Sequence, residues 1–152
     1  MRVTAKVDYA VRALTELAAA GPGVTLKGDR VAASQQLPVK FLENILAELR
    51  RAGIVASQRG SEGGYRMARD PTKVSIADVI RAVEGPLADV HGTPPEELDL
   101  PGPAAPLRDV WLATRAALRS VLEHVTIADI AGAQLPAAVT DLLADPEAWA
   151  RR

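Results

Sequence analysis

The chain has 152 residues, of which 48% are hydrophobic, 24% charged and 3% aromatic. This composition is typical of one globular domain and excludes a mainly disordered protein. There is no cysteine and there are two histidines, which excludes disulfides, cysteine nucleophiles and metal sites built from thiolates. No stretch approaches the roughly 18 apolar residues of a membrane span and the first residues do not form a secretory signal, so we expect a cytoplasmic protein with no membrane partner.

The net charge of −1 hides an uneven distribution. Residues 1–85 carry 13 Lys and Arg against 9 Asp and Glu, whereas residues 86–152 carry 5 against 10. The segment from Arg50 to Arg69 holds five arginines and one acid, Glu62. A basic patch of this kind is compatible with a nucleic-acid-binding face, although an ordinary solvated surface explains the charge alone equally well.

The first half of the chain predicts three helices in succession. Apolar residues recur three and four positions apart over residues 4–20, and a Gly-Pro-Gly sequence ends this first helix. A short second helix is expected from Asp29, as its N-cap, to Gln36. Leu37-Pro38 separates it from a third helix that ends at Gly53. The third helix is expected to bury its apolar side, namely Leu42, Ile45, Leu46 and Leu49.

A hairpin and a fourth helix follow. Residues 54–58 and 65–68 are candidate strands, joined by a glycine-rich turn over residues 59–64. Ser75 and Asp78 have the spacing of a capping box for the fourth helix, which Gly85-Pro86 closes.

The remaining chain is a loop and a long helix. Residues 86–106 contain six prolines and two glycines, which indicates a long loop. An amphipathic helix is expected over residues 107–125, followed by a short helix beginning after Thr126 and by a turn or two over residues 136–143. The expected organisation is therefore a head at 1–86, a loop at 87–106, a long helix with a short successor at 107–131, and a tail at 132–152.

Two helices across a tight turn followed by a two-stranded hairpin form the order of a winged helix-turn-helix, so the expected fold class is mainly α with a two-stranded wing. In that fold the third helix enters the major groove, and Arg59 at the wing tip meets the DNA backbone or minor groove. The competing interpretations are a half-exposed helix without a partner and a plain glycine turn. An enzyme is not expected, because the sequence shows no nucleophile–base pair, phosphate loop or metal cluster.

Several segments closely resemble the Rrf2 family of bacterial transcription regulators, which includes iron–sulfur, nitric-oxide and cysteine regulators. The resemblance lies in the opening of the chain (residues 1–13), the third helix (40–46), the wing (59–69) and the segment that follows it (78–87). It implies a homodimer that binds double-stranded DNA, with the long helix forming the dimer core.

The residues expected to face DNA fall into three groups. Base edges would be read by the exposed side of the third helix, where Asn can pair with adenine and Glu can accept from cytosine. Backbone contacts or their supports would come from the first helix, the end of the third helix and the wing. The full set is Thr4, Lys6, Tyr9, Lys40, Glu43, Asn44, Arg50, Arg51, Arg59, Gly60, Gly63, Gly64 and Arg66. An alternative for Glu43 is an ion pair with Arg50 on its own helix.

The long helix presents one apolar stripe that the resemblance assigns to dimerisation. A lone helix of this length cannot bury such a stripe beside so small a head, although packing within its own subunit is the alternative. The expected interface residues are Leu107, Trp111, Leu118, Val121, Leu122 and Val125.

The chain departs from the cluster-binding members of the family. Gly92, Asp99 and Ala105 stand near the places of the three ligand cysteines, and Asp8 and Arg12 stand where some relatives offer a further ligand. None can supply a thiolate, so we expect the cluster-free branch and no cofactor.

The signal to which the protein responds has two candidate sources. By analogy with the family, a sulfur or redox metabolite would control a repressor, and His91 in the loop is a candidate effector contact, the alternative being an ordinary exposed histidine. The other candidate is control by a bound partner enzyme.

Overall fold

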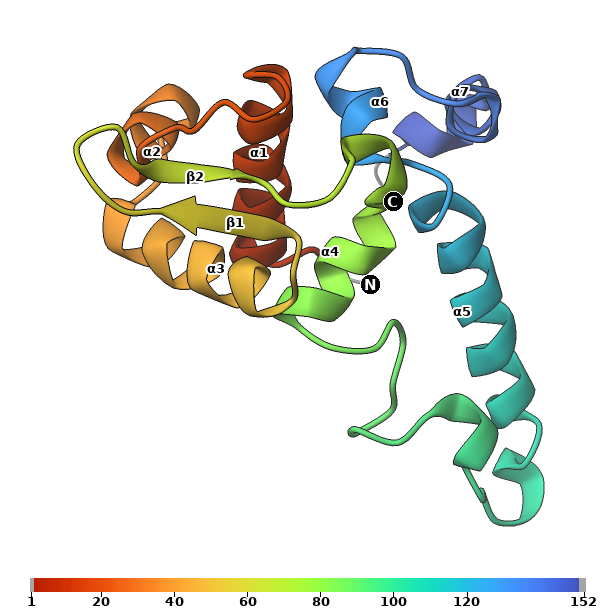
Figure 1. Ribbon diagram of the computed structural model, residues 1–152. Helices are drawn as coiled ribbons and strands as arrows, with labels where there is room; N and C mark the ends of the chain where they lie inside the picture. Colours follow the sequence, from red (N-terminus) through yellow and green to blue (C-terminus); the bar gives the residue numbers. More distant parts are fainter. Residues whose placement is uncertain (1, 151–152) are drawn as a thin grey trace.

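A computed structural model describes residues 2–150. It consists of a helical head, a two-stranded hairpin at one end of the head, and a long helix that projects from the other end (Figure 1). The elements in chain order are α1 (Ala5–Ala19), α2 (Gly28–Gln35), α3 (Val39–Arg51), β1 (Val55–Gln58), β2 (Gly64–Met67), α4 (Ile76–Val83), α5 (Leu107–Leu122), α6 (Ile127–Ala131) and α7 (Ala137–Leu143).

Helix α1 is the centre of the head, because α2, α3, α4 and α6 all pack against it. The side chain of Thr4 accepts a hydrogen bond from the backbone N–H of Val7 and so caps its first turn. The apolar stripe of α1 joins that of α3 in one core cluster, as the spacing of both helices predicts. The core therefore buries one side of α3 and leaves the opposite side exposed.

The prediction that Asp29 is the N-cap of α2 is wrong. The helix begins at Gly28, after an extended Lys27 that makes no side-chain cap. Among the described residues, the Asp29 side chain accepts a hydrogen bond only from the neighbouring backbone N–H of Arg30, at 2.7 Å. The reason lies outside the helix. Leu26 is held by a distant residue, Tyr65, and this pairing sets where the chain turns into α2.

The predicted hairpin is present, and its antiparallel register runs from Val55 opposite Met67 to Gln58 opposite Gly64. Leu26 extends it on the side of β2. The N–H of Tyr65 donates to the carbonyl of Leu26 at 2.7 Å, and the N–H of Leu26 donates back at 2.8 Å. The hairpin is therefore fastened to the turn between α1 and α2.

Helix α5 ends at Leu122, three residues before the predicted end at Val125. Val125 is 7% exposed, and its carbonyl accepts from the N–H of Ile76 at 2.9 Å. The capping box of Thr126 and Asp129 requires an extended residue at this point and starts α6 there. Val125 therefore belongs to the core of its own chain and is withdrawn from the expected interface.

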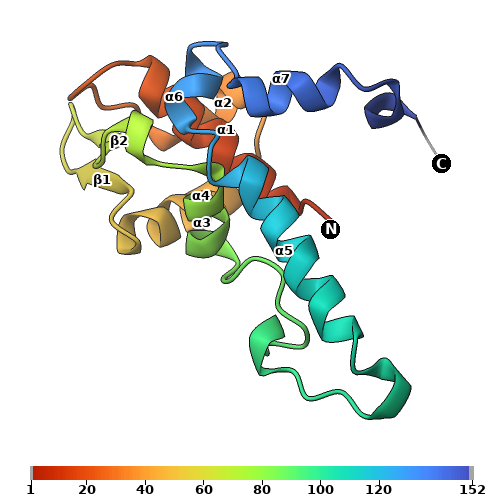
Figure 2. The same ribbon diagram turned by 90° about the vertical axis from the view of Figure 1, so that its right-hand side faces the viewer.

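Helix α5 leads away from the head, with the proline-rich loop running beside it (Figure 2). The loop is tied to α5 by an ion pair between Glu96 and Arg115, whose side-chain atoms are 2.6 Å apart. Across residues 2–150, no helix combines the length and apolarity that crossing a bilayer requires.

Candidate nucleic-acid interface

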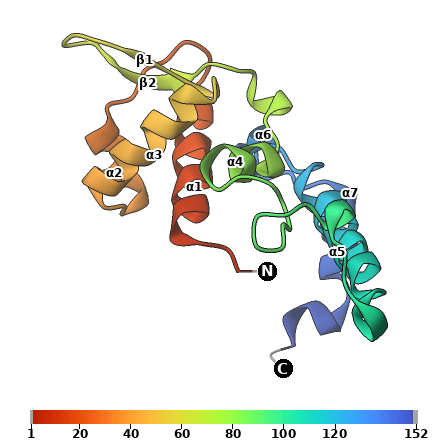
Figure 3. The ribbon, with the colours of Figure 1, turned by 90° about the horizontal axis from the view of Figure 1, so that it is seen from below.

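The exposed side of α3 offers free polar groups beside the hairpin. Seen from below, α3 and the hairpin lie at one end of the molecule and α5 and α7 at the other (Figure 3). Lys40, Glu43 and Asn44 are exposed on α3. Across residues 2–150, none of these three side chains makes a hydrogen bond or an ion pair. They are therefore available to a partner without breaking any contact within the described chain.

The alternative of a Glu43–Arg50 ion pair is not realised. The Arg50 guanidinium instead donates from Nη1 to Oγ of Ser57, at 3.0 Å. This contact joins the last turn of α3 to β1, so Arg50 supports the angle between the helix and the wing. Arg51 beside it is exposed at the same helix end.

The three first-helix residues that were expected near DNA are engaged within the chain. Thr4 caps α1 and its hydroxyl also donates to Glu84, while Lys6 pairs with Glu48 of α3 at 2.7 Å. The ring of Tyr9 meets that of Phe41 edge-on, with 5.7 Å between centroids. Lys6 and Tyr9 thereby connect α1 to both ends of the exposed side of α3, and their role here is to position that helix.

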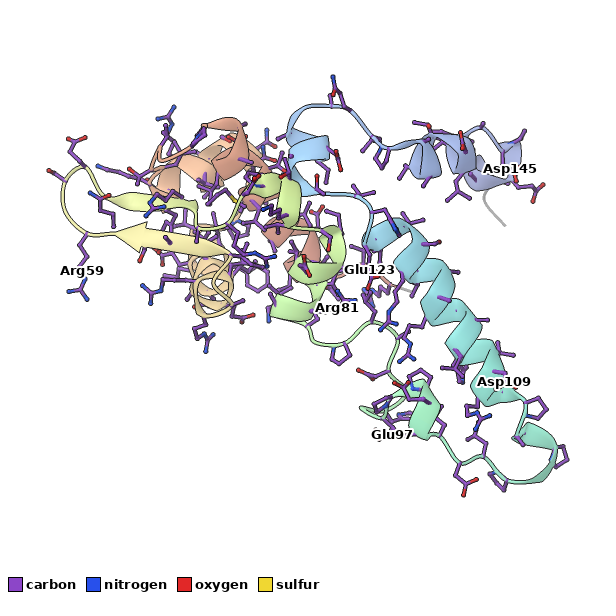
Figure 4. The ribbon with its side chains drawn as sticks, turned by 45° about the vertical axis from the view of Figure 1, so that its right-hand side comes forward. Arg59, Arg81, Glu97, Asp109, Glu123 and Asp145 are labelled. Atoms are coloured by element: carbon purple, nitrogen blue, oxygen red, sulfur yellow. The ribbon has the colours of Figure 1, made fainter. Side chains whose placement is uncertain are left out.

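The wing carries an arginine at its tip. Arg59 stands clear of the head at the end of the hairpin (Figure 4), and it is exposed. Arg66 on β2 is half-buried, with its guanidinium 3.4 Å from the carbonyl oxygen of Met67. Arg59 is thus the cation of the wing that can reach furthest from the protein.

The three wing glycines have different roles. At Gly60 a Cβ would meet nothing within 4 Å, so the tip is open. At Gly63 a Cβ would lie 2.2 Å from the carbonyl oxygen of Gln58, and at Gly64 it would lie 2.4 Å from that of Leu26. These distances support the alternative of a structural turn, because a side chain at Gly63 or Gly64 would clash where the backbone of the hairpin packs on itself and on Leu26. That the two glycines also approach DNA stays a prediction.

Helix α5 turns much of its predicted stripe toward its own chain. Trp111, Leu118, Val121 and Leu122 are half-buried. Trp111 and Leu118 line a pocket of about 400 Å³ together with residues 88–91, which include His91.

The large apolar side chains of α5 that remain exposed are Leu107, at 40%, and Val110, at 52%. The sequence interpretation missed Val110. Its spacing with Ala113 and Ala117, three and seven positions further on, is the signal that could have found it.

The residues near the expected cluster positions do not fit an iron–sulfur cluster. Asp8 and Arg12 pair with each other, with 3.2 Å between Oδ2 and Nη1, and the Arg12 guanidinium also donates to Gln35. Within residues 2–150 there is no group of three or more potential His, Cys, Asp or Glu ligands, and the whole chain lacks the thiolates that iron–sulfur clusters require.

Known proteins resemble this chain over most of its length. A family model described as an iron-dependent transcriptional regulator, Rrf2, matches residues 3–133. A protein of Mycobacterium tuberculosis named as an HTH-type transcriptional regulator is 50% identical over 145 residues, covering 95% of this chain and 90% of its own. The solved structure of CymR, the global cysteine regulator of B. subtilis, has a TM-score of 0.73 and 31% identity over 87% of this chain and 97% of its own. The solved structure of T. potens IscR has a TM-score of 0.69 and 28% identity, and the match covers 100% of this chain and 93% of the IscR chain.

Proposed function

The chain belongs to the Rrf2 family of transcriptional regulators, and from this premise we propose that it is a homodimeric, sequence-specific DNA-binding repressor that works without an iron–sulfur cluster. The mainly helical winged fold and the expectation that the chain is not an enzyme are confirmed, since the relatives with this fold are transcriptional regulators. The repressor role, the dimer and the residues that read DNA are the parts proposed here.

The observation that carries the proposal is the unpaired polar side of α3. A charged and amide-bearing face with no hydrogen bond or ion pair inside the described chain is suited to base edges, since each side chain can exchange water for a base without losing a polar partner in the protein. Asn44 would pair with adenine, Lys40 with guanine, and Glu43 would accept from cytosine. Arg51 and Arg59, at the two ends of this surface, would bind phosphates or the minor groove.

Dimerisation would place two such surfaces on one DNA duplex. Leu107 and Val110 are exposed on a helix that leads away from the head, which supports a seam between two antiparallel copies of α5. Twofold symmetry then predicts a palindromic operator whose half-sites are separated by about one helical turn or a multiple of it.

The similarity to a cysteine regulator supports a signal from sulfur metabolism. The signal could reach the protein either as a small metabolite that binds it or through a bound partner enzyme. If operator binding by the purified protein alone responds to sulfur metabolites, the first route holds, and if it responds only when an enzyme is added, the second does.

The test of DNA recognition is selection of binding sites from a randomised duplex library. We expect a palindrome for the wild type, and Asn44→Ala should lose preference at one symmetric base-pair position. Gln134→Ala removes the same amide from an exposed position between α6 and α7 and serves as the matched control. An unchanged palindrome and affinity for Asn44→Ala would exclude α3 as the reading helix.

A further inference from the structure

A second pocket, of about 350 Å³, lies between α4 and α5 and is lined by three arginines. Arg81 comes from α4, whereas Arg115 and Arg119 come from successive turns of α5. The rest of the lining is Gly85, Pro86 and Leu87, which supply apolar walls and backbone. The volume is within the range of small-molecule sites, about 300–1,000 Å³.

Carboxylates of the chain itself partner these arginines. Glu123 contacts both Arg81 and Arg119, the latter at 3.6 Å, and Asp78 is 3.7 Å from Arg81. Figure 4 shows Arg81 and Glu123 meeting where α4 faces α5.

Arg115 forms an ion pair with Glu96, and the two side chains differ in their exposure to solvent. The Arg115 side chain is 15% exposed, whereas that of Glu96 is 54% exposed. Hydrogen bonding by the backbone N–H of Glu96 and by Arg115 holds the pKa of the Glu96 carboxyl below its ordinary value. The guanidinium of Arg115 is therefore fixed in the pocket, and its carboxylate partner sits at the surface.

The carboxylates are replaceable by a ligand. The side chains of Glu96 and Glu123 are 54% and 37% exposed, so water and salt reach these carboxylates and weaken their ion pairs with the arginines. A single small anion with several oxygens could accept hydrogen bonds from the three guanidinium groups while releasing Glu96 and Glu123 to water. The planar guanidinium fork matches carboxylate and phosphate oxygens in two-point contacts.

We propose that this pocket binds a small metabolite bearing a carboxylate, sulfate or phosphate group. Binding would tie α4 of the head to α5 through Arg81, Arg115 and Arg119. If the protein is the DNA-binding dimer of the proposed function, on which this step rests, the contact would adjust the angle between each head and α5. The distance between the two copies of α3 on the operator would change with that angle.

The binding test needs no DNA. The full-length protein is titrated with inorganic phosphate, sulfate and succinate by calorimetry, with total ionic strength held constant by sodium chloride. We expect saturable binding of at least one anion. Arg115→Gln should weaken it about 10- to 100-fold, the range set by losing a charge-assisted hydrogen bond or a pair of them.

Two further variants separate the pocket from general electrostatics. Arg108→Gln removes the same charge from α5 at a position outside the lining. Among the described residues, the side chain of Arg108 forms an ion pair only with the adjacent Asp109, so this variant should bind the anion as the wild type does. Arg115→Lys keeps the charge but loses the fork, so it should bind more weakly than wild type while melting at a similar temperature.

Three outcomes would overturn the inference. The first is the absence of saturable binding by all three anions, and the second is an equal loss in Arg108→Gln. The third is a large loss of anion-free operator affinity, or of the dimer, in Arg115→Gln, which would assign the arginines to DNA or to the subunit interface. Anion binding by a protein that selects no operator would instead refute the proposed function and leave the pocket standing.

Discussion

Replacing Gly64 by alanine tests how the wing is attached to the head. The added Cβ would lie 2.4 Å from the carbonyl oxygen and 2.7 Å from the carbonyl carbon of Leu26, so the Leu26 segment must move away. That movement breaks the two backbone hydrogen bonds between Leu26 and Tyr65. Gly64 also has a φ of +153°, which side-chain-bearing residues rarely adopt.

The size of the effect follows from these contacts. Two hydrogen bonds contribute about 1 kcal/mol each, and the unfavourable φ adds about 1–3 kcal/mol. The free energy of unfolding should therefore fall by about 3–5 kcal/mol, a large part of the roughly 5–15 kcal/mol of an ordinary domain. Gly60→Ala is the matched control, because its φ of +103° imposes strain while a Cβ there meets nothing within 4 Å.

Urea and thermal unfolding followed by circular dichroism measure the difference. Gly64→Ala should be about 2 kcal/mol less stable than Gly60→Ala, which corresponds to a Tm lower by about 4–8 °C for a chain of this size. Equal destabilisation of the two variants would refute the reasoning, since it would mean that the Leu26–Tyr65 pairing contributes nothing to stability.

Four other predictions follow from the proposed interface and from the helix caps. Glu43→Ala should relax base preference at one position by about 1–3 kcal/mol. Non-specific affinity should stay equal or rise, because the change removes an acid from a surface that meets a polyanion. An unchanged base-preference profile would show that Glu43 is structural. Arg59→Ala should weaken operator binding and reduce the slope of log K against log salt by about one, and an unaltered slope would remove the wing tip from the phosphate contacts. Val110→Asp should shift the protein from dimer to monomer in light scattering, since the side chain is 52% exposed on the described chain and a charge would enter the proposed apolar seam. Its Tm should fall only by the contribution of the dimer and lose its dependence on protein concentration; a persistent dimer would place the interface elsewhere. The backbone N–H of Thr126, and then its hydroxyl, lower the pKa of the Asp129 carboxyl from its ordinary 3.8, so the cap of α6 contributes stability above that value and loses it as the pH falls through the lowered pKa. Loss of that acid dependence in Asp129→Asn, measured by unfolding at a series of pH values, checks the assignment.

The amino-acid sequence alone determined the local elements of this protein. The apolar spacing of α1 and α3, the break at Leu37-Pro38, the capping box at Ser75 and the helix start after Thr126 depend on neighbours a few residues away. Each formed as predicted. The order of these elements, with the matching segments, was also sufficient to indicate the winged fold and its family.

Tertiary structure decided every point that depends on residues distant in the chain. Pairing of Leu26 with Tyr65 moved the start of α2 away from Asp29 and placed Gly64 where an added Cβ would clash with the backbone of Leu26. Burial of Val125 removed it from the expected interface.

Local sequence patterns also do not determine which charged and apolar side chains become buried or meet one another. The spacing of α5 predicts one apolar stripe, yet whether Trp111 or Val110 remains exposed depends on where the loop of residues 86–106 folds back. Arg81 and Arg115 are 34 positions apart in sequence and meet at one pocket because α4 and α5 pack together. Helix periodicity determines which residues share a face, whereas only the packing of the whole chain determines what that face contacts.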